Sequence, residues 1–156
     1  MTQPAIALSP DAQKEIADAL NQSVAETVVT TMLAQNFHWN VKGMAFGELH
    51  RLFQEIYEDH FQGQDDLAER IRAIDAHAEG MLAGMLDRSK VKEHDGHQSD
   101  REMIEILMKA EETIAATLGG LGELAASHGD TLTEDLAIER GRAHEKFAWM
   151  LRAHLG

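Results

Sequence analysis

The sequence predicts an all-α fold, and two observations support this. Its 156 residues contain only 2 prolines, Pro4 and Pro10, so the rest of the chain lacks the strongest helix breaker. Helix-favouring residues such as Ala, Leu, Glu, Met and Gln are abundant, and apolar residues recur at three- and four-residue steps. A hydrophobic content of 44% over this length suits one domain with a sizeable core. We expect residues 1–9 to form a short tail and residues 10–156 to form that domain.

Two long helices are predicted in the first half of the chain, over residues 10–37 and 46–75. Ser9 is a suitable N-cap for the first, because its hydroxyl can accept a hydrogen bond from the first turn, and a proline and an aspartate follow it. A turn at residues 40–43 separates the two helices. Gly63 interrupts the second helix and costs about 1 kcal/mol relative to Ala.

The second half of the chain begins with a connection, residues 76–98, that is too long for a simple turn between helices. A short helix over residues 81–86 is expected inside it. A capping box in the sequence SDRE starts a third long helix over residues 99–126, and Thr133 is expected to cap the last, which ends near the C-terminus. Four long helices with one long crossover between the second and third are the ferritin-like form of the four-helix bundle.

Composition and charge exclude several kinds of protein. The chain has no cysteine, so disulfides, thiolate metal sites and thiol catalysis are excluded, and any metal ligands must be nitrogen or oxygen atoms. A formal net charge of −13 argues against a general affinity for nucleic acid or anionic membranes, although many proteins are acidic for solubility alone. No apolar run approaches the ~20 residues that span a bilayer, and no signal peptide is evident. The expected compartment is the cytoplasm, with no membrane partner.

Four potential metal ligands lie in the first half of the chain. Asp65 and Glu69 are four residues apart and share one helix face. His50 stands fifteen residues before Asp65 on the same helix, roughly 22 Å at the rise of an α-helix, whereas one ion needs all its ligands within about 2.0–2.6 Å. One chain therefore cannot join them, but two antiparallel copies about a twofold axis can, giving two equivalent sites per dimer. His38 could return beside His50 through the short turn.

The di-iron site that is usual inside such bundles requires a Glu-x-x-His pair from each of two helices. None of the 9 histidines has a glutamate three residues before it. The sequence therefore excludes that site on ligand spacing. His60 and His77 fit no pattern and are interpreted as surface residues or satisfied interface residues.

The segment NFHWNVKG at residues 36–43, followed by LH at 49–50, Asp65 and AERI at 68–71, is similar to the signature of the Dps family. These are the miniferritins, or DNA-protection proteins of starved cells. The segment HEKFAWMLR near the C-terminus also matches, and the resemblance covers nearly the whole chain in order. It implies a hollow shell of twelve subunits in which Fe(II) is bound at twofold interfaces. There it is oxidised, preferably with hydrogen peroxide, and the product is stored inside as Fe(III) mineral.

By position, the resemblance implies that His38 and His50 are iron ligands from one chain. Asp65 and Glu69 would then be ligands from its partner in the twofold dimer. Trp39 would lie beside the site, where the family is thought to use it as an electron donor, and packing at the interface is its simpler role.

One residue departs from the family pattern. The family usually places Asp four residues after the second histidine, and this chain has Gln54 there. A neutral amide is a poorer ligand than a carboxylate for a hard cation. Glu58, one turn further on, is a candidate to compensate, and so is Glu55, although Glu55 should point off this helix face. We therefore predict one firmly bound iron per site and a weak second.

The resemblance also implies threefold pores whose acidic residues admit Fe²⁺. The candidates are Asp130, Glu134 and Asp135, which have the simpler role of complementing the start of the last helix. A ferroxidase is the leading hypothesis, and Gln54 alone supports an alternative, a shell protein with a degenerate single-metal site and little turnover. Direct DNA binding and compaction are not expected, because no basic residue precedes Lys14 and phosphate binding needs clustered positive charge.

Overall fold

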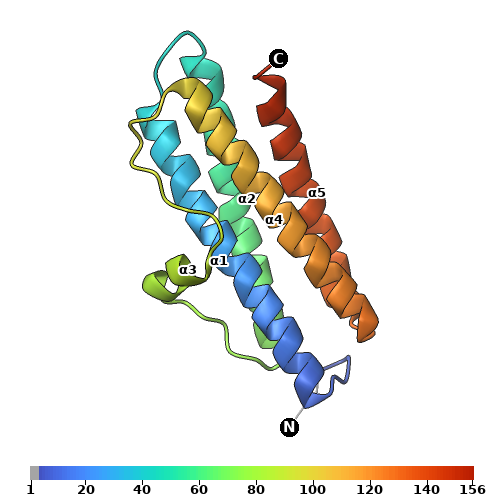
Figure 1. Ribbon diagram of the computed structural model, residues 1–156. Helices are drawn as coiled ribbons and strands as arrows, with labels where there is room; N and C mark the ends of the chain where they lie inside the picture. The colour runs from blue at the N-terminus through green and yellow to red at the C-terminus, as the bar shows by residue number, and fades with distance from the viewer. Residues whose placement is uncertain (1–3) are drawn as a thin grey trace.

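A computed structural model describes residues 4–156, so residues 1–3 of the predicted tail lie outside the described part. The described residues form five helices and no strand: α1 (Pro10–Asn40), α2 (Phe46–Ala73), α3 (Leu82–Arg88), α4 (Asp100–Ser127) and α5 (Thr131–Ala153). Figure 1 shows α1, α2, α4 and α5 side by side in a bundle, with the short α3 on its outside. The predicted all-α fold, with an extra helix in the crossover, is confirmed.

The connection through α3 sets the topology of the bundle. In Figure 1, α1 and α5 run in one direction and α2 and α4 in the other. Because α2 and α4 are parallel, the chain must travel the length of the bundle between them, and this explains the long segment that precedes α4. No helix in the described part of the chain is long and apolar enough to cross a membrane.

Side-chain caps start the helices largely where the sequence predicts them. Ser9 Oγ accepts from the amide of Ala12 at 3.1 Å, and the capping box that starts α4 is formed. Two boundaries differ from the prediction. α1 continues to Asn40 because no residue breaks it before the left-handed turn at Gly43, where φ is 111°. α5 begins at Thr131 because Asp130, and not Thr133, is its N-cap.

The core lies along the shared axis of the four long helices. The apolar side chains that recur along one face of α2 are buried, and apolar side chains of α1 and α4 pack against them in the centre of the bundle. The largest fully buried side chains are Ile16, Leu20, Phe37, Leu49, Phe53, Ile56, Leu67, Ile71, Met103, Leu107, Ile114 and Leu118. This packing fixes the rotation of α2 about its axis, and so decides which of its polar residues face inward and which face outward.

Gly63 does not interrupt α2, and the structure explains why a glycine stands there. A Cβ at this position would lie 2.5 Å from Cζ of Arg140, far inside van der Waals contact. Arg140 crosses from α5, is 6% exposed, and donates from Nη2 to Asp59 Oδ2 at 2.7 Å. The missing side chain of Gly63 therefore makes room for a buried arginine.

Candidate metal centre

Two histidines meet where α1 ends and α2 begins. The rings of His38 and His50 are stacked, with centroids 3.7 Å apart and planes inclined by 13°. His38 is buried and His50 is half-buried. The five-residue turn between the helices brings them together, so the predicted return of His38 beside His50 is confirmed.

The hydrogen bonds of this pair determine which ring nitrogens remain free. Nδ1 of His38 bonds to the backbone carbonyl of His50 at 2.6 Å, and Nδ1 of His50 bonds to the carbonyl of His38 at 2.7 Å. A carbonyl oxygen can only accept, so each Nδ1 must carry the proton and donate. In the neutral rings both Nε2 atoms then hold a free lone pair. This reciprocal bonding fixes the tautomer that metal coordination through Nε2 requires.

Aromatic neighbours hold the pair of rings in place. Phe46 lies against His50 with ring centroids 5.1 Å apart, and Tyr57 meets His38 edge-on at 5.3 Å. Rings confined in this way cannot turn freely, so the two Nε2 atoms are already oriented before a metal ion binds.

The two carboxylates predicted as ligands lie at the other end of the same helix. The side chains of Asp65 and Glu69 are exposed, and neither is hydrogen-bonded or ion-paired to another residue of the described 4–156. α2 is unbroken from His50 to Asp65, so the separation of roughly 22 Å expected from helical rise applies. Within one chain the structure does not bring the histidines and the carboxylates together.

An apolar groove of about 600 Å³ is lined by residues of α1, α2 and α3, and none of the four predicted ligands lines it. Trp39 is 59% exposed and lines it together with other large apolar side chains of α1, α2 and α3, namely Met32, Phe61, Leu82 and Leu86. Exposed apolar surface gathered in this way is typical of an interaction surface rather than of a solvated face.

Gln54 lies on α2 one turn after His50. Its amide Nε2 donates to Glu58 Oε1 at 2.8 Å. Gln54 and Glu58 are therefore directly hydrogen-bonded. The side-chain carbonyl oxygen of Gln54 is then the atom that it has left to coordinate a metal ion.

The acidic residues at the start of α5 have different surroundings. Asp130 is buried, accepts from the amide of Thr133 at 3.1 Å, and pairs with Nη2 of Arg70 at 2.9 Å. Its carboxylate therefore has a structural role at the helix N-terminus. Glu134 is half-buried and Asp135 is exposed.

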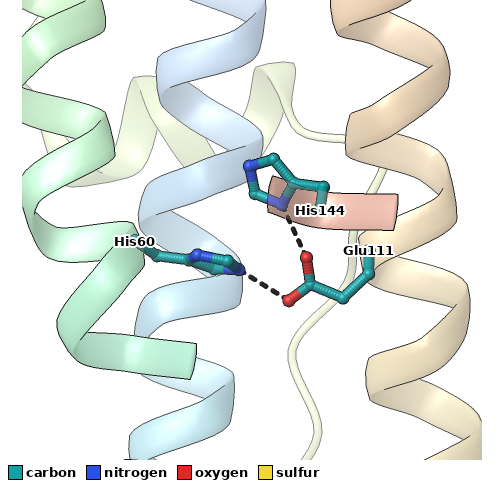
Figure 2. Close-up of side chains that lie close together, drawn as sticks. All are labelled: His60, Glu111 and His144. Atoms are coloured by element: carbon teal, nitrogen blue, oxygen red, sulfur yellow. Dashed lines mark hydrogen bonds and ion pairs between the residues drawn. The ribbon is translucent and has the colours of Figure 1, made fainter. Parts of the chain in front are cut away.

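His60 is neither a surface nor an interface residue, and that prediction is wrong. It is fully buried inside the bundle, where Nε2 lies 2.6 Å from Glu111 Oε1. The other carboxylate oxygen, Oε2, lies 2.5 Å from Nδ1 of His144, and Figure 2 shows the three side chains pointing toward one another from α2, α4 and α5. A search for Glu-x-x-His pairs could not find this group, because each member comes from a different helix.

These contacts set the ionisation of the buried group. Burial would raise the pKa of Glu111, but the charges and hydrogen bonds of His60 and His144 lower it to about 2. Burial would lower the pKa of His60, but Glu111 and Asp59 raise it above the usual value. For His144 burial prevails and the pKa is lowered. The carboxylate is therefore ionised at neutral pH, and His60 holds a proton more strongly than His144 does.

Known proteins share this fold over the whole chain. The ferritin family model, for a ferritin-like domain, matches residues 17–156. A DNA protection during starvation protein of Brevibacillus brevis is 36% identical, over 92% of this chain and 96% of its own. DNA protection during starvation protein 2 of Bacillus anthracis is 35% identical, over 91% of this chain and 97% of its own. A solved Dps protein of Vibrio cholerae, described as a ferritin-like diiron-carboxylate protein, superposes with a TM-score of 0.93 at 33% identity, covering 100% of this chain and 98% of that one.

The bundle with its long crossover, together with a histidine pair where α1 meets α2, defines a ferritin-like protein. The similarity to known sequences and to known structures identifies the family within that class. The chain belongs to the Dps family of ferritin-like proteins.

Proposed function

We propose that this protein is an iron-sequestering ferroxidase that works at sites shared between two chains. Fe(II) is its substrate, hydrogen peroxide or oxygen is the oxidant, and the product is stored as Fe(III) mineral inside a shell of twelve subunits. The observation that carries the proposal is the stacked pair of His38 and His50, because its reciprocal hydrogen bonds leave both Nε2 atoms free as ligands.

Each site would take His38 and His50 from one chain and Asp65 and Glu69 from its partner. Two antiparallel copies of α2 about a twofold axis place the histidine end of one against the carboxylate end of the other. The exposed groove beside Trp39 supports this arrangement, since a partner chain would cover its apolar side chains. Trp39 would then lie beside the site as an electron donor.

The ligand set favours oxidation of the bound iron. Two carboxylates contribute two negative charges, and their attraction to Fe³⁺ exceeds that to Fe²⁺ because Coulomb energy scales with the charge of the ion. Two Fe²⁺ ions each give one electron to one peroxide, whose O–O bond breaks, and two protons complete two waters. Iron and peroxide are consumed together without release of a hydroxyl radical, and this accounts for a protective role.

Gln54 limits the second iron in each site. Its amide offers one neutral oxygen where a carboxylate would add a charge, and its nitrogen is bonded to Glu58. We propose one firmly bound iron per site and a weak second. The same residue supports the second candidate function, a shell with a single-metal site and little turnover.

Acidic residues at the start of α5 are proposed to line the route by which Fe²⁺ enters. Asp135 and Glu134 have side chains that reach solvent, and Asp130 holds the helix start from which they project. Direct DNA binding is not part of the proposal, because the chain has a net charge of −13. Retardation of DNA by the metal-free shell in a low-salt gel would contradict that.

The proposal is tested by the rate of Fe(II) oxidation after replacing one ligand from each half-site. His50→Ala and Asp65→Ala should each abolish saturable oxidation, while light scattering shows shells of unchanged size. The matched control is Asp66→Ala, the neighbouring acid on α2, which should oxidise iron at the original rate. Unchanged rates in both ligand variants would remove the proposal, and firm iron binding without turnover in the original protein would favour the single-metal shell.

A further inference from the structure

The buried group in the bundle has no part in the proposed iron site at the interface. His60, Glu111 and His144 come from three helices, and all three are fully buried. One donor atom from each lies within 4.8 Å of the other two. The whole set belongs to one chain, whereas the interface site needs two.

The donor atoms are of the kind that hold transition metals. Two imidazole nitrogens and one carboxylate oxygen form the set that binds zinc in many enzymes and iron(II) in non-haem centres. We propose that His60, Glu111 and His144 bind one divalent transition-metal ion, zinc or iron(II), inside each four-helix bundle. The Glu-x-x-His spacing of a di-iron site is absent, so one ion is expected and not two.

The space between the side chains can accommodate such an ion after small movements. The two contacts to Glu111 are 2.6 and 2.5 Å long, as hydrogen bonds are. Ligands bound to zinc at about 2.1 Å in a tetrahedron are roughly 3.4 Å apart. Each contact therefore has to lengthen by less than about 1 Å, which rotations within the side chains can supply.

A second layer of residues orients His60 for this role. Its Nδ1 lies 3.0 Å from Asp59 Oδ2, and because an ionised carboxylate can only accept, Nδ1 donates. Nε2 is thereby directed toward Glu111 as the metal-binding nitrogen, in the carboxylate–histidine–metal pattern. Arg140 fixes Asp59 in turn, with Nη2 to Oδ2 at 2.7 Å, in the space left by Gly63.

The protein's own hydrogen bonds do not complete this network. Within residues 4–156, three buried side-chain polar atoms have no partner, and two of them belong here: Nε2 of His144 and Nε of Arg140. A buried polar atom without a partner costs free energy, and native proteins usually satisfy it with a water or an ion. Nε2 of His144 lies across its ring from Nδ1, the atom that faces Glu111, so the ion itself would not satisfy it, and a water molecule at the site would be its partner.

The test uses the shell after the interface site has been removed by His50→Ala and Asp65→Ala together. This protein is produced with Co²⁺ or Zn²⁺ in the growth medium, so that a buried site can fill during folding. Bound metal is counted by elemental analysis, and Co²⁺ is located by anomalous diffraction. The expected result is one ion per chain, with a peak between α2, α4 and α5 and the visible absorption of Co²⁺ in a low-coordinate nitrogen and oxygen site.

Adding His144→Gln should remove the ion, and adding His77→Gln, a change at an exposed histidine, should leave it in place. A folded shell without stoichiometric metal would overturn the proposal and leave a hydrogen-bonded cluster. Anomalous peaks found only outside the space between α2, α4 and α5 would also overturn it. If His144→Gln fails to assemble, the anomalous map of the parent still decides between these results. Because the interface site is already absent, failure here says nothing against the proposed ferroxidase.

Discussion

Gly63 is where two opposite effects of one substitution can be compared. Replacing glycine by alanine inside a helix usually stabilises by about 1 kcal/mol, because alanine loses less backbone freedom on folding. Here the added Cβ would lie 2.5 Å from Cζ and Nη2 of Arg140. A long side chain can often move away from such a contact at little cost, but this one is buried and bonded to Asp59 at 2.7 Å. Moving it would disturb the pair that orients His60.

We therefore expect Gly63→Ala to destabilise the protein. Overpacking of a buried site costs typically about 1–3 kcal/mol, so about 0–2 kcal/mol of destabilisation remains after the propensity gain is subtracted. Disturbing the partly buried ion pair of Arg140 with Asp59 adds to this loss. The control is Gly119→Ala on α4, where nothing lies within 4 Å of the added Cβ and a gain of about 1 kcal/mol is expected.

Both variants are measured by urea unfolding at one fixed subunit concentration, because assembly contributes to apparent stability. The predicted order of midpoints is Gly119→Ala highest and Gly63→Ala lowest, with the unchanged protein between them. If Gly63→Ala is as stabilising as the control, Arg140 moves away from the added Cβ at little cost and is not confined by its bond to Asp59.

Further predictions concern Glu111, Gln54 and two acidic residues at the start of α5. The pKa of Glu111 is lowered from 4.5 to about 2, so its ionised form stabilises the metal-free fold above pH 4.5, and this contribution, of order 3 kcal/mol, is lost as pH falls toward 2. The free energy of unfolding, measured against pH in the presence of a chelator, should show this loss of stability, and the Glu111→Gln variant should not show it. Gln54→Asp should raise tight iron binding from one to two ions per site in an anaerobic titration, and an unchanged count would show that Gln54 is not the limit. Asp130→Ala should destabilise by about 2–4 kcal/mol through loss of a cap and a buried partner of Arg70. Asp135→Ala should leave stability unchanged and slow iron uptake, and equal effects of the two on stability would contradict their assigned roles.

The fold could be predicted from the sequence because its determinants are local. Helix-favouring composition, the Ser9 and Ser99 caps and the apolar periodicity of α2 act within a few residues of one another. The start of α5 was misplaced for a physical reason. Asp130 and Thr133 are both suitable caps, and only the packing of Arg70 against the carboxylate shows which one the helix uses.

The two candidate metal sites differ in how far they could be predicted from the sequence. The His38 and His50 pair could be predicted because a short turn joins their helices, and helical rise alone separates them from Asp65. The group around Glu111 could not be predicted, since its members are 51 and 33 residues from that carboxylate. Only the packing of three helices brings them together. The sequence shows only that Gly63 lowers the helix propensity of α2. The need for a glycine comes from Arg140, which lies on α5.

The central claim is that each iron site is completed by a second chain, and mixing two inactive variants tests it most directly. His50→Ala and Asp65→Ala chains are co-assembled in equal amounts. Every mixed dimer then holds one site with both defects and one intact site, so random pairing should restore about a quarter of the original saturable oxidation. Each variant assembled alone should remain inactive. A mixture as inactive as its components would contradict a site shared between two chains.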